Sequence, residues 1–500
     1  MIQYFKVTTL SPLFIGSGIS LIPGADYVHF PDRKIVAILE PEIFFQKFNL
    51  DKRFIEQWSN ALMNIESREQ KARTLRNLLN QKKPNFKPED ISETLIPTDE
   101  RVLDEEIKKH TRSGNGLLLI PGSSIKGAIR TAFFSNYLLS KYSKGAISLN
   151  EFSSNKDSEY SDRQYNNSIF KNNNNHAIYD FFRFLLISDG FTDRSSIIKT
   201  LSIVLDNSQY IMREDLRTYL ECIPEGVDFY IQMKWNENLF NKNKEKNNIN
   251  RNINEELSSL LHTSKKQTKR LFDFEHNLFF NESNIYNQKC IEKIEESFHD
   301  DKSYILRISG QTGYLNMTGG WQEDLLSKSD LQELALYVRK NTKSKSEDDS
   351  LPFPKSRRIT ADGKPLGYIK LTPIEKSDYY RALDNQLKKA FEGIIIEEIK
   401  PKSELESEIE LRPEADSAPT TPINPYFTGK EIKQNTELLA ECISPPTGRR
   451  SRVKVFLQEP KTVEADMNGY ASAEPGKLYR VKVTRLQYGR VMEVSYVGEV

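Results

Sequence analysis

The chain has 500 residues, which is enough for about three domains. It contains 71 Lys and Arg against 70 Asp and Glu, so a formal net charge of +1 excludes a uniformly basic nucleic-acid-binding surface. Hydrophobic residues make up only 37%, which predicts loops or inserts outside the cores. The cysteines Cys222, Cys290 and Cys442 lie far apart, which argues against a disulfide scaffold and a cysteine-ligated zinc site.

Targeting signals are not found in the sequence. No stretch of 18 apolar residues predicts a transmembrane helix, and the N-terminus begins directly with a strand pattern. It has neither the basic nor the apolar region of a signal peptide. We therefore expect a cytoplasmic protein without a membrane partner.

Strand and helix patterns alternate along the first 371 residues. Tyr4–Leu10 is predicted to be a strand that ends at Ser11–Pro12, and a glycine turn, Gly16-Ser17-Gly18, follows. The other predicted strands are Ile35–Leu39, Leu117–Ile120, Phe182–Ile187, Leu201–Leu205, Val227–Trp235, Tyr304–Ile308 and Leu366–Leu371, and the predicted helices are about Arg53–Ile65, Arg68–Leu79 and Ser124–Lys141. This alternation indicates α+β or α/β domains.

Two asparagine-rich stretches interrupt this order. One spans Asn155–Asn175, and the other, Trp235–Asn254, holds nine asparagines in 20 residues. Such composition buries little apolar surface, so both are predicted to be surface inserts with little structure. Codon bias of an AT-rich genome is one explanation, and an RNA-contacting loop is the other.

The composition changes again near the C-terminus. Glu397–Asp416 holds eight acidic and three basic residues, and the proline-containing run Ser417–Pro425 follows it. Together they predict a linker. The alternating runs Arg452–Leu457, Lys477–Thr484 and Arg490–Tyr496 then predict a small all-β unit, such as a partly open barrel.

The segment Ile120-Pro-Gly-Ser-Ser-Ile-Lys-Gly-Ala-Ile-Arg130 is the sharpest local feature. Gly122 allows a turn, Ser123 or Ser124 can cap the helix that follows, and Lys126 and Arg130 share one helix face. Free amides and a partial positive charge at the helix N-terminus attract phosphate. The alternative is an ordinary capped helix with two solvated cations.

Two later segments have a similar character. Ile308–Trp321 contains Gly310, Gln311, Thr312, Gly313 and Tyr314, so its backbone could approach a ligand closely while Tyr314 and Trp321 stack on bases. A loop with core aromatic residues is the alternative. Lys355, Arg357 and Arg358 form a cationic patch, for which a solvated surface is the alternative.

Catalytic signals are weaker than these binding signals. The sequence has no HxxxH, HxH or Gly-x-Ser-x-Gly pattern, and the single dyad His299-Asp300 is weak evidence for a metal-dependent phosphohydrolase. Asp26 and His29 lie near the first glycines and could act as acid or base in RNA cleavage. Nothing in the spacing requires this role, and we expect no catalytic residues, cofactor or metal.

The motif order resembles RAMP proteins of type III CRISPR systems. The motifs that carry this resemblance are Ser11–Gly18, Pro121–Arg130, Ile187–Asp189, Glu221–Gly226, Gly310–Tyr314, Pro354–Arg358 and Pro365–Lys370. The series is most similar to the fifth subunit of the Csm (type III-A) complex. Phe14 stands where that family usually has histidine, and Tyr368 where it often has tryptophan. The resemblance covers about residues 1–371.

The resemblance implies an α+β fold with two ferredoxin-like (RRM-like) domains, over 1–222 and 223–396. The linker over 397–434 and the small β-rich domain over 435–500 come from composition and alternation and lie outside the resemblance. The resemblance also implies a noncatalytic RNA-binding subunit that caps the crRNA 3′ end and supports crRNA maturation in antiviral defence. The expected partners are crRNA, the backbone RAMP subunit, other effector subunits, target RNA and host nucleases.

The predicted RNA-binding residues come from the three glycine or basic segments and the first glycine turn. They are Gly16, Ser17, Gly18, Gly122, Ser123, Ser124, Lys126, Arg130, Gly310, Gln311, Thr312, Gly313, Tyr314, Lys355, Arg357 and Arg358. The alternative function is a metal-independent RAMP endoribonuclease that processes CRISPR repeat RNA, with His29 as its candidate catalytic residue.

Overall fold

A computed structural model describes most of the chain. The described residues are 2–390 except 49, 66, 102, 104, 148–152, 155–156, 161–162, 172–179, 207–208, 245–252, 281–284 and 342–355, and 434–499 except 444–449, 457–461, 469–472 and 488–489. The chain divides into two compact units, Met1–Ile394 and Ile395–Val500. No helix in the described part is long and apolar enough to cross a membrane.

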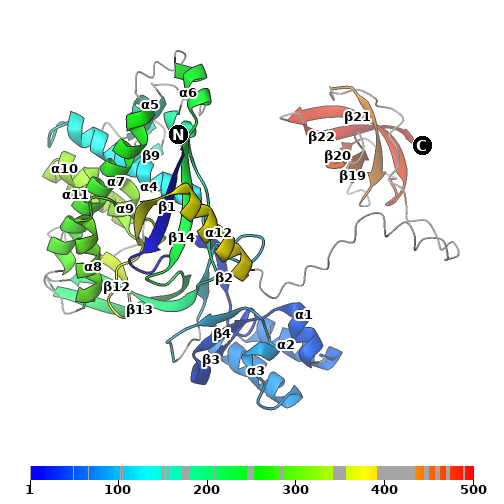
Figure 1. Ribbon diagram of the computed structural model, residues 1–500. Helices are drawn as coiled ribbons and strands as arrows, with labels where there is room; N and C mark the ends of the chain where they lie inside the picture. The colour runs from blue at the N-terminus through cyan, green and yellow to red at the C-terminus, as the bar shows by residue number, and fades with distance from the viewer. Residues whose placement is uncertain are drawn as a thin grey trace. The chain divides into compact units, whose positions relative to one another are not determined.

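The first unit mixes strands and helices throughout (Figure 1). Its strands are β1 (Ile2–Thr9), β2 (Gly16–Leu21), β3 (Tyr27–Phe30), β4 (Ile35–Ile38), β5 (Leu95–Pro97), β6 (Ile107–His110), β7 (Leu118–Ile120), β8 (Ser153–Ser154), β9 (Asp157–Tyr160), β10 (Leu185–Ile187), β11 (Gly190–Thr192), β12 (Ser196–Asp206), β13 (Gln209–Cys222), β14 (Asp228–Trp235), β15 (Tyr304–Arg307), β16 (Ser356–Thr360) and β17 (Tyr368–Ile374). Its α-helices are α1 (Pro41–Phe48), α2 (Lys52–Asn64), α3 (Arg68–Lys82), α4 (Gly122–Lys141), α5 (Arg163–Lys171), α6 (Glu237–Lys244), α7 (Ile253–Glu275), α8 (Gln288–Phe298), α9 (Tyr314–Thr318), α10 (Trp321–Leu325), α11 (Lys328–Asn341) and α12 (Lys376–Ala390).

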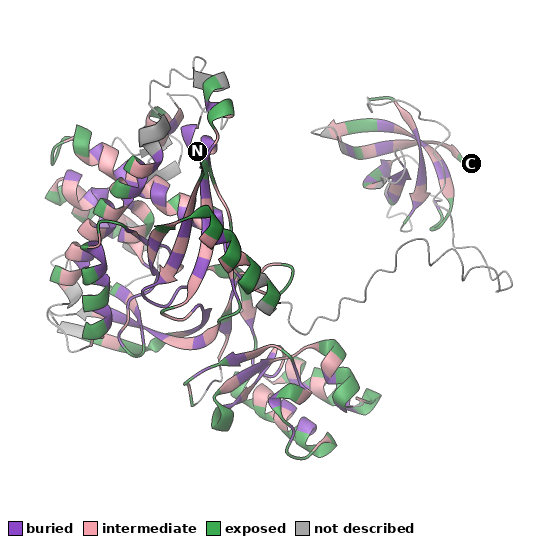
Figure 2. Ribbon diagram, viewed as in Figure 1, coloured by how far each residue is buried: buried purple, intermediate pink, exposed green. Residues whose placement is uncertain are grey.

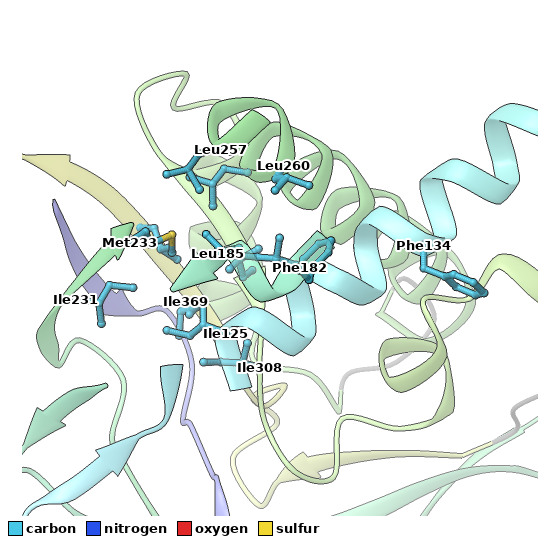
Figure 3. Packing of buried hydrophobic residues seen from close by; sticks show 14 of the residues in the cluster. Ile125, Phe134, Phe182, Leu185, Ile231, Met233, Leu257, Leu260, Ile308 and Ile369 are labelled. Atoms are coloured by element: carbon cyan, nitrogen blue, oxygen red, sulfur yellow. The ribbon is translucent and has the colours of Figure 1, made fainter. Parts of the chain in front are cut away.

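The main sheet has the order β10-β14-β1-β17-β15. β1 is central and pairs antiparallel with β14 and β17, with Phe5 opposite Ile231 and Pro373. One face of the sheet is buried under α4 and α7, where Ile125, Leu257 and Leu260 meet strand residues such as Ile231 and Met233 (Figure 3). This packing fixes the position of α4.

A second sheet, β16-β12-β13-β6-β2, carries the long β12–β13 hairpin. Between β2 and β6 the chain forms a separate lobe, in which the sheet β3-β4-β5 packs with α1, α2 and α3. The lobe has its own core, which includes Phe44, Phe54 and Leu75.

The predicted division at residues 222 and 223 stays a prediction. β1 comes from the first range and pairs with β14 and β17 from the second. Likewise, β16 pairs with β12. Strands from both ranges therefore share two sheets within one compact unit.

Two local predictions are wrong. Phe181–Phe184 is a short 3-10 helix, and only β10 remains of the strand expected over Phe182–Ile187, because the Asp180 side chain accepts from the amide of Phe182. The asparagine-rich stretches contain α5 and α6, whose Phe170 and Phe240 are buried. One buried aromatic side chain anchors each helix despite the polar composition, while residues 172–179 and 245–252 lie outside the described part.

The second unit contains a closed barrel in the order β18-β19-β20-β22-β21. Its strands are β18 (Glu437–Cys442), β19 (Arg450–Phe456), β20 (Thr462–Asn468), β21 (Leu478–Gln487) and β22 (Arg490–Glu499). β20 and β22 pair in parallel, and the other neighbours are antiparallel. Inward side chains such as Val453, Tyr479 and Val494 form its core.

Candidate nucleic-acid interface

Three of the sequence motifs meet at a cavity of about 380 Å³ in the first unit. Its walls come from the start of β2, from one side of α4, from α7, and from β15 with the segment that follows it. The lining residues are Ile15, Gly16, Ser124, Ala128, Thr131, Ala132, Gln267, Thr268, Leu271, Leu306, Arg307, Ile308, Ser309, Gly310, Asn316, Met317 and Gly319. The fold thus brings Gly16, Ser124 and Gly310 together from positions far apart in sequence.

The first glycine segment is a strand, so the predicted turn is wrong. Gly16, Ser17 and Gly18 are exposed at the start of the edge strand β2. The register with β6 shifts between Gly16 and Ser20, and Gly18 has a φ of 82° there, a conformation that favours glycine. The Ser17 hydroxyl donates to the carbonyl of Lys109 at 3.0 Å. The irregular edge leaves backbone groups open beside the cavity.

A buried histidine holds this edge in place. His110 Nδ1 accepts from the amide of Ile15 at 3.2 Å, and Nε2 lies 3.2 Å from the carbonyl of Leu119. Burial lowers the pKa of His110 to about 4, so the ring is neutral and donates from Nε2. The Glu221 carboxylate accepts from the His110 amide and pairs with Arg112. His110 is therefore a structural residue with both ring nitrogens bonded.

The start of α4 differs from the predicted cap. Pro121 is the N-cap, and neither Ser123 nor Ser124 forms a side-chain capping bond, because both already lie in the first turn. The Gly122 amide donates to Asp189 Oδ1 at 2.8 Å. A Cβ on Gly122 would lie 2.2 Å from the carbonyl oxygen of Ile187. Gly122 thus serves a close approach within the chain, while Ser123 is exposed and Ser124 lines the cavity.

Both predicted phosphate-binding cations of α4 have partners within the chain. Lys126 Nζ donates to the carbonyl of Leu185 at 2.7 Å, and burial lowers its pKa. Arg130 pairs with Asp180 at 2.8 Å, and its guanidinium carbon lies 3.6 Å from the ring centre of Phe170. These contacts attach α4 to the segment around β10, so in the free chain neither side chain is a free cation.

The predicted glycine segment after β15, Gly310–Tyr314, forms a tight loop on another wall of the cavity. The Gly310 amide donates to the carbonyl of Phe14 at 2.7 Å. Gln311 and Gly313 have φ of 67° and 88°, and burial leaves Gln311 Oε1 without a hydrogen-bond donor. Thr312 donates to the carbonyl of Ser309 at 3.2 Å. Tyr314 is half-buried against the main core, so much of its ring is already packed.

The structure contradicts the predicted role of Arg357. Arg357 and Arg307 flank the carboxylate of Glu275 at 2.9 and 2.7 Å, and all three side chains are at most 5% exposed. Arg358 is half-buried on β16, where it donates to Thr200, Thr218 and the carbonyl of Leu216. As consecutive residues of β16 the two arginines lie on opposite faces of the sheet, and only Arg357 is fully buried. Lys355 lies outside the described residues.

Three residues beside this site were not among the predicted ones. Lys108 and Lys109 lie on β6 next to β2, and neither has a carboxylate partner within the described residues. Gly127 is exposed in α4, and a Cβ there would meet no atom within 4 Å. A glycine inside a helical pattern and two adjacent lysines in a strand were the available signals.

The histidines of the nuclease alternative lie elsewhere. His29 is on β3 in the separate lobe, where burial first and then Arg76 lower its pKa. His299 is the C-terminal cap of α8. Neither lines the cavity. Within the described chain, no group of three or more His, Cys, Asp or Glu side chains is arranged to hold a metal ion.

The polar groups of the cavity suit a ligand that presents sugar and backbone atoms. Ser124, Thr131, Ser309 and Asn316 supply hydroxyl and amide groups, and the cation among the described lining residues, Arg307, is neutralised by Glu275. Uncompensated positive charge lies outside the cavity, on β6. Such a surface can contact sugar and backbone atoms within and phosphates at its edge.

Comparison with known proteins finds a matching family model and several similar proteins. A model of the RAMP superfamily matches residues 6–314. A Methanocaldococcus jannaschii protein described as CRISPR system Cms protein Csm5 is 28% identical over 334 residues, covering 58% of this chain and 74% of the relative. A chain of the cryo-EM structure of a type III-A Csm–crRNA–target RNA ternary complex aligns with a TM-score of 0.51 at 20% identity, covering 74% of this chain and 100% of that one. The crystal structure of T. onnurineus Csm5 gives a TM-score of 0.49 at 18% identity, over 73% and 99%.

Proposed function

The chain belongs to the RAMP superfamily, and we propose that it is a noncatalytic RNA-binding subunit of a type III-A (Csm) effector complex that caps the crRNA 3′ end. The observation that carries the proposal is the convergence of three RAMP-like motifs on one cavity. The similarity to a protein described as Csm5 supports the choice of subunit. In this role the chain supports crRNA maturation in antiviral defence.

The proposed contact uses backbone and hydroxyl groups more than cations. The exposed glycines of β2, the exposed Gly127 and the hydroxyl groups of the cavity offer close approach to a ribose–phosphate chain. Lys108 and Lys109 would neutralise phosphates next to that path. Lys126, Arg130 and Arg357 act indirectly, by holding the elements that form the walls.

The proposed partners follow from the same similarity. The related solved complex contains crRNA and target RNA by its description. We extend this to crRNA, target RNA, the backbone RAMP subunit and other effector subunits for this chain. The proposed organisation remains two ferredoxin-like halves, 1–222 and 223–396, followed by a linker and a terminal β domain.

The test is crRNA length in assembled complexes that carry single-site changes. Gly127→Leu adds a side chain to the open face of α4, where the free chain has space for it. If RNA passes there, complexes should contain less crRNA, or crRNA with heterogeneous 3′ ends, while the thermal stability of the chain is kept. Lys108→Gln/Lys109→Gln should reduce the slope of log affinity against log salt by about 1.4, or about 0.7 for each lost contact.

A control variant distinguishes the loss of contacts at the site from the loss of positive charge elsewhere on the chain. Lys289→Gln/Lys302→Gln removes two exposed lysines from the region of α8, away from the cavity, and should change neither crRNA length nor the salt slope. Uniform, wild-type crRNA ends in Gly127→Leu complexes, together with an unchanged salt slope in the β6 variant, would remove this cavity from the RNA path. Loss of mature crRNA in a folded His29→Ala variant would point to the nuclease function instead.

A further inference from the structure

The outer face of the main sheet carries a second group of ligand-type side chains. Residues alternate along β1, so that Phe5 and Val7 enter the core while Tyr4 and Lys6 lie on the opposite face. The neighbouring β14 alternates in the same way, with Tyr230, Gln232 and Lys234 outward. None of these outward residues lines the cavity described above.

One end of this face is apolar and open. The pairing register places Leu186, Lys234 and Ile2 side by side across β10, β14 and β1. Leu186 and Ile2 are 46% and 42% exposed. Tyr4 is the next outward residue on β1. Large apolar side chains that are both exposed and adjacent mark a binding surface more often than isolated ones.

Helix α12 completes the surface with aromatic rings. It lies over β1 and β14, as Figure 1 shows, and its outward side is exposed in Figure 2. Tyr379 packs on Tyr4 with ring centres 5.0 Å apart, while Tyr380 lies 6.0 Å from Tyr4 and is 47% exposed. Lys376 Nζ lies 5.9 Å from the Tyr380 ring centre. We call Ile2, Tyr4, Leu186, Lys234, Lys376 and Tyr380 the outer-sheet patch.

The charges of the patch favour a polyanion. Neither Lys234 nor Lys376 has a carboxylate within 4.0 Å among the described residues. The nearby Lys6 pairs with Asp228 at 3.0 Å, but both side chains are about 40% exposed, so this pair is weak and exchangeable. A protein interface would be expected to exclude free lysines from its centre, whereas an RNA strand needs them.

We propose that the outer-sheet patch binds single-stranded RNA as a second site, separate from the cavity. Bases would stack on the exposed ring of Tyr380, which Tyr4 supports from below, and pack on Ile2 and Leu186, while Lys234 and Lys376 would meet phosphates. This is the physical arrangement by which an open sheet with aromatic residues on central strands binds unpaired bases. The choice of RNA as ligand rests on the proposed function; the location of the site does not.

The experiment measures binding of a 15-nucleotide single-stranded RNA of mixed sequence to the full chain. Tyr380→Ala should weaken binding about 5- to 150-fold, the range for one lost base stack. Lys234→Gln/Lys376→Gln should reduce the salt slope by about 1.4. The matched control is the exposed-helix pair on α4, where Lys141 Nζ lies 5.6 Å from the Tyr137 ring. Tyr137→Ala/Lys141→Gln should leave both quantities unchanged.

Each outcome of this experiment supports or overturns the outer-sheet patch as an RNA site. Equal affinity in Tyr380→Ala, or an equal loss in the Tyr137 control, overturns the patch as an RNA site. Unchanged RNA affinity combined with loss of other complex subunits on copurification also overturns it and assigns the patch to a protein partner. If only the β6 lysines matter, the proposed function stands and the second site falls. If the unmodified chain binds neither this RNA nor crRNA, both fall.

Discussion

Two glycines five residues apart in α4 should respond to the same substitution in opposite ways. In Gly122→Ala, the new methyl group would lie 2.2 Å from the carbonyl oxygen of Ile187 and 2.9 Å from that of Ser188. These are backbone atoms, so relief requires α4 itself to move. In Gly127→Ala the methyl group meets no atom within 4 Å. The position of the glycine, rather than its residue type, therefore decides whether the substitution lowers or raises the free energy of unfolding.

The magnitudes follow from what each change disturbs. Overpacking of a close contact costs about 1–3 kcal/mol, and displacement of α4 also weakens the bond from the Gly122 amide to Asp189, worth about 1.5–3 kcal/mol as a bond to a charged group. Gly122→Ala should therefore lower the free energy of unfolding by about 2–5 kcal/mol. Gly127→Ala should raise it by up to about 1 kcal/mol, because alanine loses less backbone entropy in a helix.

Urea denaturation followed by circular dichroism measures both variants against the unmodified chain. The close-approach argument is refuted if Gly122→Ala unfolds at the unmodified urea midpoint with an unchanged slope. A destabilised Gly127→Ala would instead show that its surroundings are occupied. Gly122→Ser provides a second check, because its Cβ makes the same clash and it should be destabilised as well.

Two further predictions concern buried charges. Glu275→Gln removes the carboxylate that compensates both Arg307 and Arg357, and it should lower the free energy of unfolding by about 3–5 kcal/mol in urea; a loss below about 1 kcal/mol would contradict the buried network. His110, with a folded pKa of about 4 against about 6.5 for a solvent-exposed histidine, gives stability that is complete above pH 6.5 and is lost as the pH falls through 4. That loss should reach about 3 kcal/mol and be absent from the pH profile of His110→Gln; parallel profiles for the two proteins would refute it.

Periodicity and composition predicted only part of the elements, and the long strand β13 and the helices α7, α8 and α12 were not predicted. The alternation in β1 and the spacing of Ile125, Ile129 and Ala132 in α4 depend on local pattern alone, and the structure has both elements near their expected bounds. The helices α5 and α6 were not predicted, since a single buried phenylalanine anchors each within a polar sequence. The β2 edge was missed because its irregular pairing depends on β6, some 90 residues later.

The difference between local pattern and packing against distant residues also explains the predictions for the candidate site. Local sequence shows that Lys126 and Arg130 share a helix face, but it does not show which element packs against that face. In the structure that element supplies the carbonyl of Leu185 and the carboxylate of Asp180, which occupy both cations. Among the described residues Lys108 and Lys109 on β6 have no carboxylate partner, and they stood out less in the sequence because they lack a glycine motif.

Lys126, Arg130 and Arg357 already have partners within the chain, which limits what they could add to RNA binding. A cation that already has a partner within the chain gains little from a phosphate, because binding the phosphate would leave that partner without its cation. Binding energy must then come from the lysines of β6, β14 and α12, from backbone and hydroxyl groups at exposed glycines, and from open aromatic rings. In this chain those groups lie in two places, beside the cavity and on the outer-sheet patch. Two modest sites on one compact unit would hold a single RNA strand more tightly than either alone, since the second contact is intramolecular once the first is made.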